Sequence, residues 1–190
     1  MCGRLNVIDD PLVHWICNVL GVEFTTQTNR DLRPTQTVDT IAATGSGAGQ
    51  LATTWGIKPS WAKKLIINAQ AETVAEKPTF KKAFSSHRCI VPCTGWYEWR
   101  DEGGPRKQRY AFSHTDGIPF LMAGMWFDQP SQAELVTLTT KPLDRCAEIH
   151  HRMPLLIDPE HVELWLNGPT AELDPIMTTN CDDHIAICRV

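Results

Sequence analysis

Residues 88–100 read RCIVPCTGWYEWR, an apolar run followed by aromatic side chains around a carboxylate. A Pro-x-x-Gly break precedes the aromatic part, which is predicted to form a strand. Alternate residues of a strand share a face, so Trp96 and Glu98 are expected to point the same way. Tyr97 and Trp99 then occupy the opposite face. A carboxylate among aromatic rings is desolvated, which predicts a raised pKa and a general acid/base role; an exposed glutamate is the alternative.

The segments around this stretch alternate in the manner of strands. They are punctuated by Gly and Pro, which favours a strongly curved or barrel-like antiparallel sheet over a doubly wound fold. We therefore predict the α+β class, with a curved, barrel-like, mainly antiparallel β core flanked by short helices. The expected strands are 37–43 and 50–56, on either side of the loop GSGAG (45–49), then 108–114, 118–127 and 134–140.

Three segments have the apolar spacing of helices. Asp9-Asp10-Pro11 precedes the first, which predicts an Asp cap, a helix opening at Pro11 and a stop at Gly21. The second covers 77–88, and the third covers 159–168 and ends at a glycine.

The chain of 190 residues is long enough for one domain with its own core, and we predict a single domain over 1–190. A net charge of -4 argues against a protein that coats nucleic acid indiscriminately, although a local basic groove remains compatible with it. The first residues lack the pattern of a signal peptide, and no apolar run reaches membrane-spanning length. A cytoplasmic protein without membrane contact is expected.

Seven cysteines, an odd number, predict free thiols in an intracellular chain. Cys89 and Cys93, with His87 nearby, could form half of a metal site, but no compact second half follows. We therefore expect neither a metal nor a cofactor. Cys17, Cys89 and Cys188 lie among apolar neighbours and are interpreted as core thiols.

The chain begins MCGR. Removal of Met1 would leave Cys2 with an α-amine and a thiol on adjacent carbons, and both have reference pKa values near neutrality. The amine can form a Schiff base with an aldehyde, and the thiol can close on the imine carbon to give a thiazolidine. The thiol could instead attack an acyl group. A third interpretation makes Cys2 a small residue that opens a buried strand.

Two further segments carry polar groups of catalytic type. In NAQAETV (68–74), Asn68 can cap a helix or direct its amide at a reacting amine or carbonyl. In EIHHRMP (148–154), a histidine pair precedes an arginine, a combination that can shuttle protons and hold a phosphate. Adjacent histidines in a strand face opposite ways, so only one is expected in a site; a surface pair is the alternative.

Taken together these segments resemble the SRAP (SOS response-associated peptidase) family, whose members process abasic sites in DNA. The resemblance covers nearly the whole chain and also includes RPTQTV (33–38) and WGIKPSWAK (55–63). It implies that Cys2 cross-links to the ring-opened aldehyde of an abasic site. Asn68 would orient the reacting N-terminus, while Glu98 and His150 would move protons through Schiff-base formation, β-elimination and thiazolidine closure.

The resemblance also implies a substrate and its contacts. The substrate is expected to be single-stranded DNA, and the protein a monomer that associates with the nucleoid when it binds DNA. Arg4 could hold a phosphate, Trp61 could stack a base, and Trp55 is expected in the core. The full set of expected DNA-binding residues is Arg4, Pro34, Trp61, Gln70 and Arg152.

The sequence departs from the family pattern in three respects. Gln70 stands where the family usually has Arg, which would remove one phosphate contact. Cys93 replaces a small residue without a thiol, and the chain is shorter than many members. Two other functions stay open: a thiol-dependent peptidase or autoprotease that uses Cys2 with His150 and Asn68, and a non-catalytic reader of damaged DNA.

Overall fold

The structure, a computed structural model, describes residues 2–45, 47–178 and 184–190. The strands are β1 (Leu5–Val7), β2 (Asn29–Leu32), β3 (Thr37–Thr44), β4 (Gly47–Trp55), β5 (Asn68–Gln70), β6 (Arg88–Cys93), β7 (Gly95–Arg100), β8 (Gln108–His114), β9 (Phe120–Phe127), β10 (Ala133–Thr140), β11 (Met153–Pro154) and β12 (Ile185–Arg189). The α-helices are α1 (Asp9–Leu20), α2 (Pro78–Ser86), α3 (Asp144–Ala147) and α4 (Val162–Asn167), and the short 3₁₀ helices are η1 (Ala71–Thr73), η2 (Pro159–His161), η3 (Thr170–Glu172) and η4 (Asp174–Ile176).

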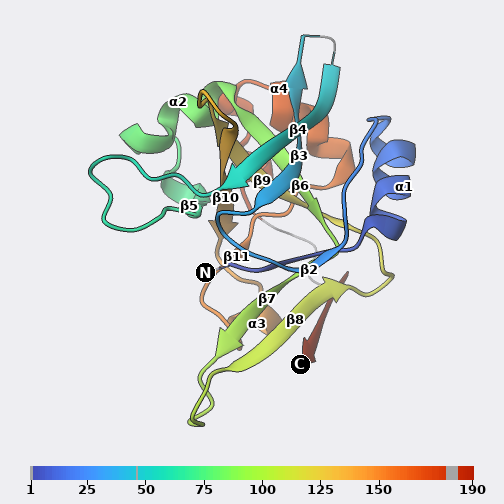
Figure 1. Ribbon diagram of the computed structural model, residues 1–190, viewed down its shortest axis with the longest axis vertical. Helices are drawn as coiled ribbons and strands as arrows, with labels where there is room; N and C mark the ends of the chain where they lie inside the picture. The colour runs from blue at the N-terminus through green and yellow to red at the C-terminus, as the bar shows by residue number, and fades with distance from the viewer. Residues whose placement is uncertain (1, 46, 179–183) are drawn as a thin grey trace.

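The strands form two sheets (Figure 1). One has the order β12-β8-β7-β1-β2, and the other runs β11-β10-β4-β3-β6-β9 with β5 beside β10. Because β9 also pairs with β10, the strands β10, β4, β3, β6 and β9 close into a ring. The pairings are antiparallel except those of β10 with β4 and β5. The predicted α+β class with a barrel-like, mainly antiparallel core is confirmed.

The stretch 88–100 joins the two sheets. Its first half is β6 of the ring and its second half is β7 of the other sheet, with Thr94 between them. The predicted Pro-x-x-Gly break (92–95) contains this junction, although Pro92 itself still lies inside β6. The ladder with β3 ends before Pro92, so its ring nitrogen needs no strand partner on that side. Gly95 is required sterically, since a Cβ there would lie 2.1 Å from the carbonyl oxygen of Phe112.

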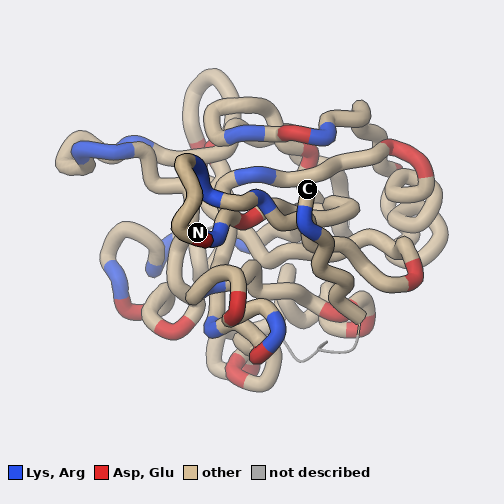
Figure 2. The backbone as a smooth tube through the Cα atoms, turned by 90° about the horizontal axis from the view of Figure 1, so that it is seen from below, with Lys and Arg blue, Asp and Glu red and all other residues tan. Residues whose placement is uncertain are grey.

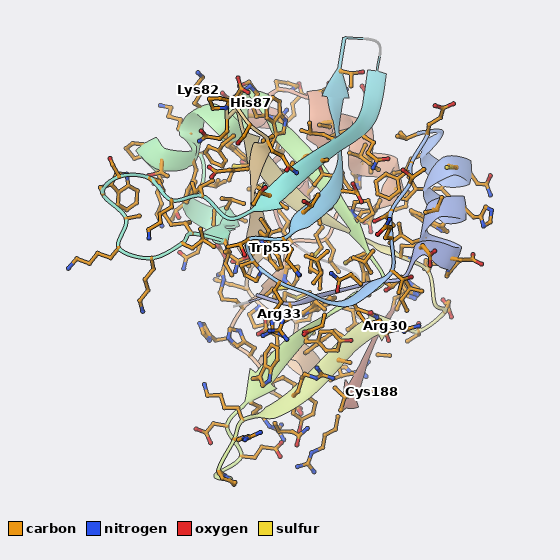
Figure 3. The ribbon with its side chains drawn as sticks, in the orientation of Figure 1. Arg30, Arg33, Trp55, Lys82, His87 and Cys188 are labelled. Carbon is orange, nitrogen blue, oxygen red and sulfur yellow. The ribbon has the colours of Figure 1, made fainter. Side chains whose placement is uncertain are left out.

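Large apolar side chains fill the ring, and Trp55 is fully buried among them, as predicted (Figure 3). Its indole N–H donates to the carbonyl of Ile67 at 3.1 Å. The buried guanidinium of Arg88 donates to the carbonyls of Phe84, Trp165 and Gly168. These bonds tie α2 and α4 to β6 and satisfy a buried charge.

The predicted helices are present. Within α1, Asp10 has extended backbone angles (φ -113°, ψ 121°), which is the conformation of a residue that precedes a helix, so the helical turns open at Pro11 as predicted. Asp9 accepts a hydrogen bond from Thr28. Gly21 ends the helix at φ 65°, a conformation that glycine adopts without strain.

The cysteines divide differently from the prediction. Cys89 and Cys93 are buried in β6, and burial raises the pKa of Cys93 to about 12. Cys17 and Cys188 are exposed, which contradicts their assignment to the core. Cys17 follows the buried Ile16 and therefore lies about 100° around the helix from it. Cys188 lies on the edge strand β12, as Figure 3 shows.

No helix among the described residues combines the length and the apolar character needed to cross a membrane.

Candidate active site

Glu98 lies on the inner face of β7. Trp96 and Glu98 are both buried, as the strand alternation predicts, and the glutamate is only 3% exposed. The rings of Tyr97 and Trp99 lie on the opposite face, beneath the guanidinium groups of Arg109 and Arg4, respectively. The alternative of an exposed glutamate is therefore excluded.

Burial raises the pKa of Glu98 from its ordinary 4.5 to about 7, in the predicted direction. Its Oε2 lies 3.9 Å from Nε2 of His150. Burial also lowers the pKa of His150. Near neutral pH the two groups are therefore better described as a carboxyl and a neutral imidazole that can exchange a proton than as a fixed ion pair.

The backbone holds the imidazole of His150 in place. Its Nδ1 accepts a hydrogen bond from the N–H of Arg152 at 3.1 Å, which leaves Nε2 to face Glu98. The predicted strand through the histidine pair is absent, because both residues lie in a turn before β11. Their rings stack with centroids 4.3 Å apart instead of facing opposite ways. His150 is nevertheless the one beside Glu98.

Asn68 begins β5, which pairs in parallel with β10. The hydroxyl of Thr137 on β10 donates to Oδ1 of Asn68 at 2.5 Å. This bond fixes the orientation of the amide, so its Nδ2 donates to the backbone carbonyl of Cys2 at 2.9 Å. Asn68, on the sheet that contains β10, thus holds the amino-terminal segment, and this segment leads into β1 of the other sheet.

Cys2 is buried just before β1, and β1 pairs with β7. Burial, followed by the charges of Glu98 and Cys93, raises the pKa of the Cys2 thiol well above its ordinary value. This raised pKa belongs to the chain that retains Met1; for a mature chain that begins at Cys2, the expectation of a thiolate accessible near neutrality stays a prediction. In Figure 1 the label N lies between β5 and the β7–β8 hairpin. The chain direction of β1 thus brings Cys2, Asn68 and Glu98 to one place.

Arg152 pairs with Glu72, a residue that the sequence did not single out. Two hydrogen bonds of 2.8 and 2.7 Å join the guanidinium to the carboxylate, and a third reaches the carbonyl of Thr139. The Arg152 hydrogen bond lowers the pKa of Glu72. The arginine side chain is only 12% exposed. The pair joins the segment of Asn68 to the turn of His150, a link that spacing along the sequence does not predict.

Arg4 is also paired. Its guanidinium donates to Oδ1 of Asp31 at 2.5 Å, while Oδ2 of Asp31 accepts from Arg33. Pro34 follows in the turn after β2, so the predicted DNA-binding residues Arg4 and Pro34 lie in one neighbourhood. Figure 3 labels Arg33 and Arg30 along β2.

The two remaining residues of the predicted DNA-binding set are exposed. Gln70 ends β5 opposite Thr139 of β10, next to the Arg152 pair. Trp61 is 66% exposed in the loop between β4 and β5, which projects to one side in Figure 1, and it lines a hollow with Lys58 and Phe127. In Figure 2 segments of both charges, Lys and Arg as well as Asp and Glu, lie near the label N. The structure thus brings the four proposed chemical residues together and places Trp61 on a separate loop.

The fold is of the α+β class, and the buried Glu98 and the partly buried His150 lie beside Cys2. Residues 1–190 match the family described as SOS response associated peptidase (SRAP), and the chain belongs to that family.

Several named relatives resemble the chain. It is 32% identical over 187 residues to the abasic site processing protein YoqW of Bacillus subtilis, covering 92% of this chain and 84% of the relative. It is 35% identical over 134 residues to the abasic site processing protein YedK of Escherichia coli, covering 67% and 60%. A solved structure from Bordetella bronchiseptica superimposes with a TM-score of 0.84 at 19% identity, over 100% of this chain and 99% of the other. This last likeness concerns the fold alone.

Proposed function

We propose that this protein processes abasic sites in single-stranded DNA by forming a covalent cross-link through Cys2. The names of the relatives support the substrate class. The observation that carries the proposal is the hydrogen bond from Asn68 to the carbonyl of Cys2, beside the Glu98–His150 pair. An N-terminal amine at Cys2 would then lie at a fixed position near an acid/base pair suited to neutral pH.

The buried thiol suggests an order for the steps. The α-amine of Cys2 attacks the aldehyde carbon of the ring-opened sugar, a C–N bond forms, and water leaves to give an imine. Glu98 or His150 protonates the departing oxygen. The thiol sulfur then adds to the imine carbon while its proton passes to the imine nitrogen, which gives a thiazolidine without any oxidation or reduction. A thiol that is neutral before the imine forms suits this order.

The same thiol argues against the peptidase alternative. A cysteine peptidase needs a thiolate, and its environment lowers the thiol pKa. In the chain that retains Met1, burial and the charge of Glu98 raise the pKa of the Cys2 thiol instead.

The test uses single-stranded DNA with one abasic site. Mature protein, with loss of Met1 verified by intact mass, is incubated with this DNA and examined on a denaturing gel for a heat-stable adduct. We expect an adduct with the wild type and none with Cys2→Ala. Cys93→Ala is the matched control, since it removes a second buried thiol and should leave the adduct. An adduct that survives Cys2→Ala, or none with the wild type, would refute the proposal.

A further inference from the structure

Three side chains of metal-ligating type meet at a corner away from the active site. They are His114 at the end of β8, Asp116 in the turn that follows, and His184 just before β12. Their ligating atoms all lie within 4.8 Å of one another. Oδ2 of Asp116 is 3.9 Å from Nδ1 of each histidine. The two imidazoles stack with centroids 5.1 Å apart at 8°.

The sheet register places these residues together. Ile185 pairs with His114, so His184 lies just past the end of the ladder, where its carbonyl accepts from the N–H of Thr115 at 2.9 Å. Gly117, at φ 71°, closes the turn by donating to the carbonyl of His114. Backbone pairing therefore brings the three residues to one corner, and only their side chains remain to be oriented.

We propose that this corner binds a divalent transition-metal cation, for which Zn²⁺ is the probe, with His114, Asp116 and His184 as ligands. Two imidazoles and one carboxylate form a known donor set for such ions. Within the part of the chain that the structure describes, this is the one such cluster. The sequence predicts no metal site because His184 is remote from residues 114–116 along the chain.

The electrostatics suit a cation. Nδ1 of His114 accepts from the N–H of Asp116 at 3.0 Å, so this nitrogen carries a lone pair and no proton. Asp158 lines the adjoining hollow together with apolar residues, and its carboxylate adds to the negative potential. A metal bound at Nδ1 of His114 would displace the hydrogen bond from the backbone N–H of Asp116. Because Asp116 is exposed, that N–H can donate to water instead.

The ligands must move closer to bind. A tetrahedral zinc site with bonds near 2.0–2.1 Å separates its ligand atoms by about 3.3 Å. His114 is held by packing, with its side chain 10% exposed, whereas those of His184 and Asp116 are 56% and 71% exposed. Rotation of two exposed side chains toward a fixed imidazole can therefore close the site.

The proposed site is independent of the cross-linking chemistry. Glu98 pairs with Tyr110, and His114 lies four residues further along β8, about 13 Å away at ~3.3 Å per residue. A metal at the corner would join β12 to the turn after β8 and stabilise an edge strand. The expected consequence is greater stability without an effect on the adduct yield.

The experiment titrates ZnCl₂ into the full chain with Cys17→Ser, Cys188→Ser and Cys181→Ser; the first two are the exposed thiols among the described residues, and Cys181 lies outside them, three residues before His184. Calorimetry gives the stoichiometry, and ring ¹⁵N NMR identifies the histidines. We expect one equivalent to bind, with the nitrogens of His114 and His184 shifting. His161→Ala is the matched control, because His161 lies 3.9 Å from Asp158 but belongs to no three-residue cluster.

The variant His184→Ala should weaken Zn²⁺ binding at least about tenfold. Loss of a residue that only hydrogen-bonds to a ligand already lowers metal affinity by about that factor, and loss of the ligand itself should lower it more. Asp116→Asn should weaken it as well, and His161→Ala should leave it unchanged. Zn²⁺ should also raise the melting temperature of the parent and not that of His184→Ala. Absence of binding, unchanged affinity in His184→Ala, or shifts confined to His150 and His151 would each overturn the proposal.

Discussion

Two glutamates border the candidate active site, and their surroundings give them opposite properties. Glu98 is buried on β7, and burial raises its pKa to about 7. Glu72 is 37% exposed, and its bidentate bonds with Arg152 lower its pKa. The same side chain is therefore a proton carrier in one segment and a fixed anion in the other. The difference teaches that a carboxylate whose burial dominates has a raised pKa and can exchange a proton near neutral pH, whereas a bidentate bond to a guanidinium lowers the pKa and produces a structural tie.

The largest expected effect comes from substituting Glu98, the glutamate whose pKa is raised. Glu98→Gln removes the proton carrier while keeping the shape, so the cross-linking rate should fall about 10²–10⁴-fold with little change in DNA affinity. Single-turnover gels and fluorescence anisotropy measure the two quantities. Glu72→Gln is the control and should slow the reaction much less. Equal losses of rate and affinity in Glu98→Gln would assign that residue to binding only.

The next effect concerns pH. The folded protein holds a proton on Glu98 between about pH 4.5 and 7, where the unfolded chain has released it. The resulting stabilisation is complete below pH 4.5 and is lost as the pH rises through 7, by up to about 3 kcal/mol. Urea unfolding across this window should show the fall in the wild type and a flatter profile in Glu98→Gln. The pKa of Glu72 is lowered in the folded protein, so its pH dependence runs the other way: the stability that Glu72 contributes is present at neutral pH and is lost as the pH falls.

A smaller effect is expected from breaking the ion pair between Arg152 and Glu72. Arg152→Ala leaves Glu72 and the carbonyl of Thr139 without their partner, so we expect a loss of about 1–3 kcal/mol in the free energy of unfolding. Arg189→Ala is the matched control, because it removes the more exposed pair with Glu102 and should lose less than about 1 kcal/mol. Similar losses in the two variants would mean that the Arg152 pair has no special structural role.

The smallest effect lies in the segment of Glu72. Gln70→Arg adds a positive charge on an exposed strand end, beside the Arg152 pair. The affinity for single-stranded DNA should rise several-fold, and the slope of log affinity against log salt should steepen by about one. Gln27→Arg adds the same charge elsewhere on the exposed surface. If the DNA affinity rises equally in both variants, the rise comes from the added net charge and not from the position of residue 70.

The fold was largely predictable because its signals are local. Strand alternation, turn residues and helical spacing are written along the chain, so the strands after residue 100 and the ring-like sheet were expected. The errors came where a neighbour overrides the local signal. Pro92 was predicted as part of a break, but it still lies in β6 because β3 no longer pairs there. His150 and His151 were assigned to a strand, yet they stack in a turn.

The sequence by itself determined which groups this protein has: a cysteine behind the initiator methionine, a glutamate among aromatics, and an asparagine and a histidine in recognisable segments. Only the tertiary structure decided their states. Burial sets the pKa values of Glu98 and the Cys2 thiol, and the pairing of Arg152 with Glu72 depends on two distant segments. The physical reason is that desolvation and ion pairing depend on what lies beside a group in space, which spacing along the chain does not record.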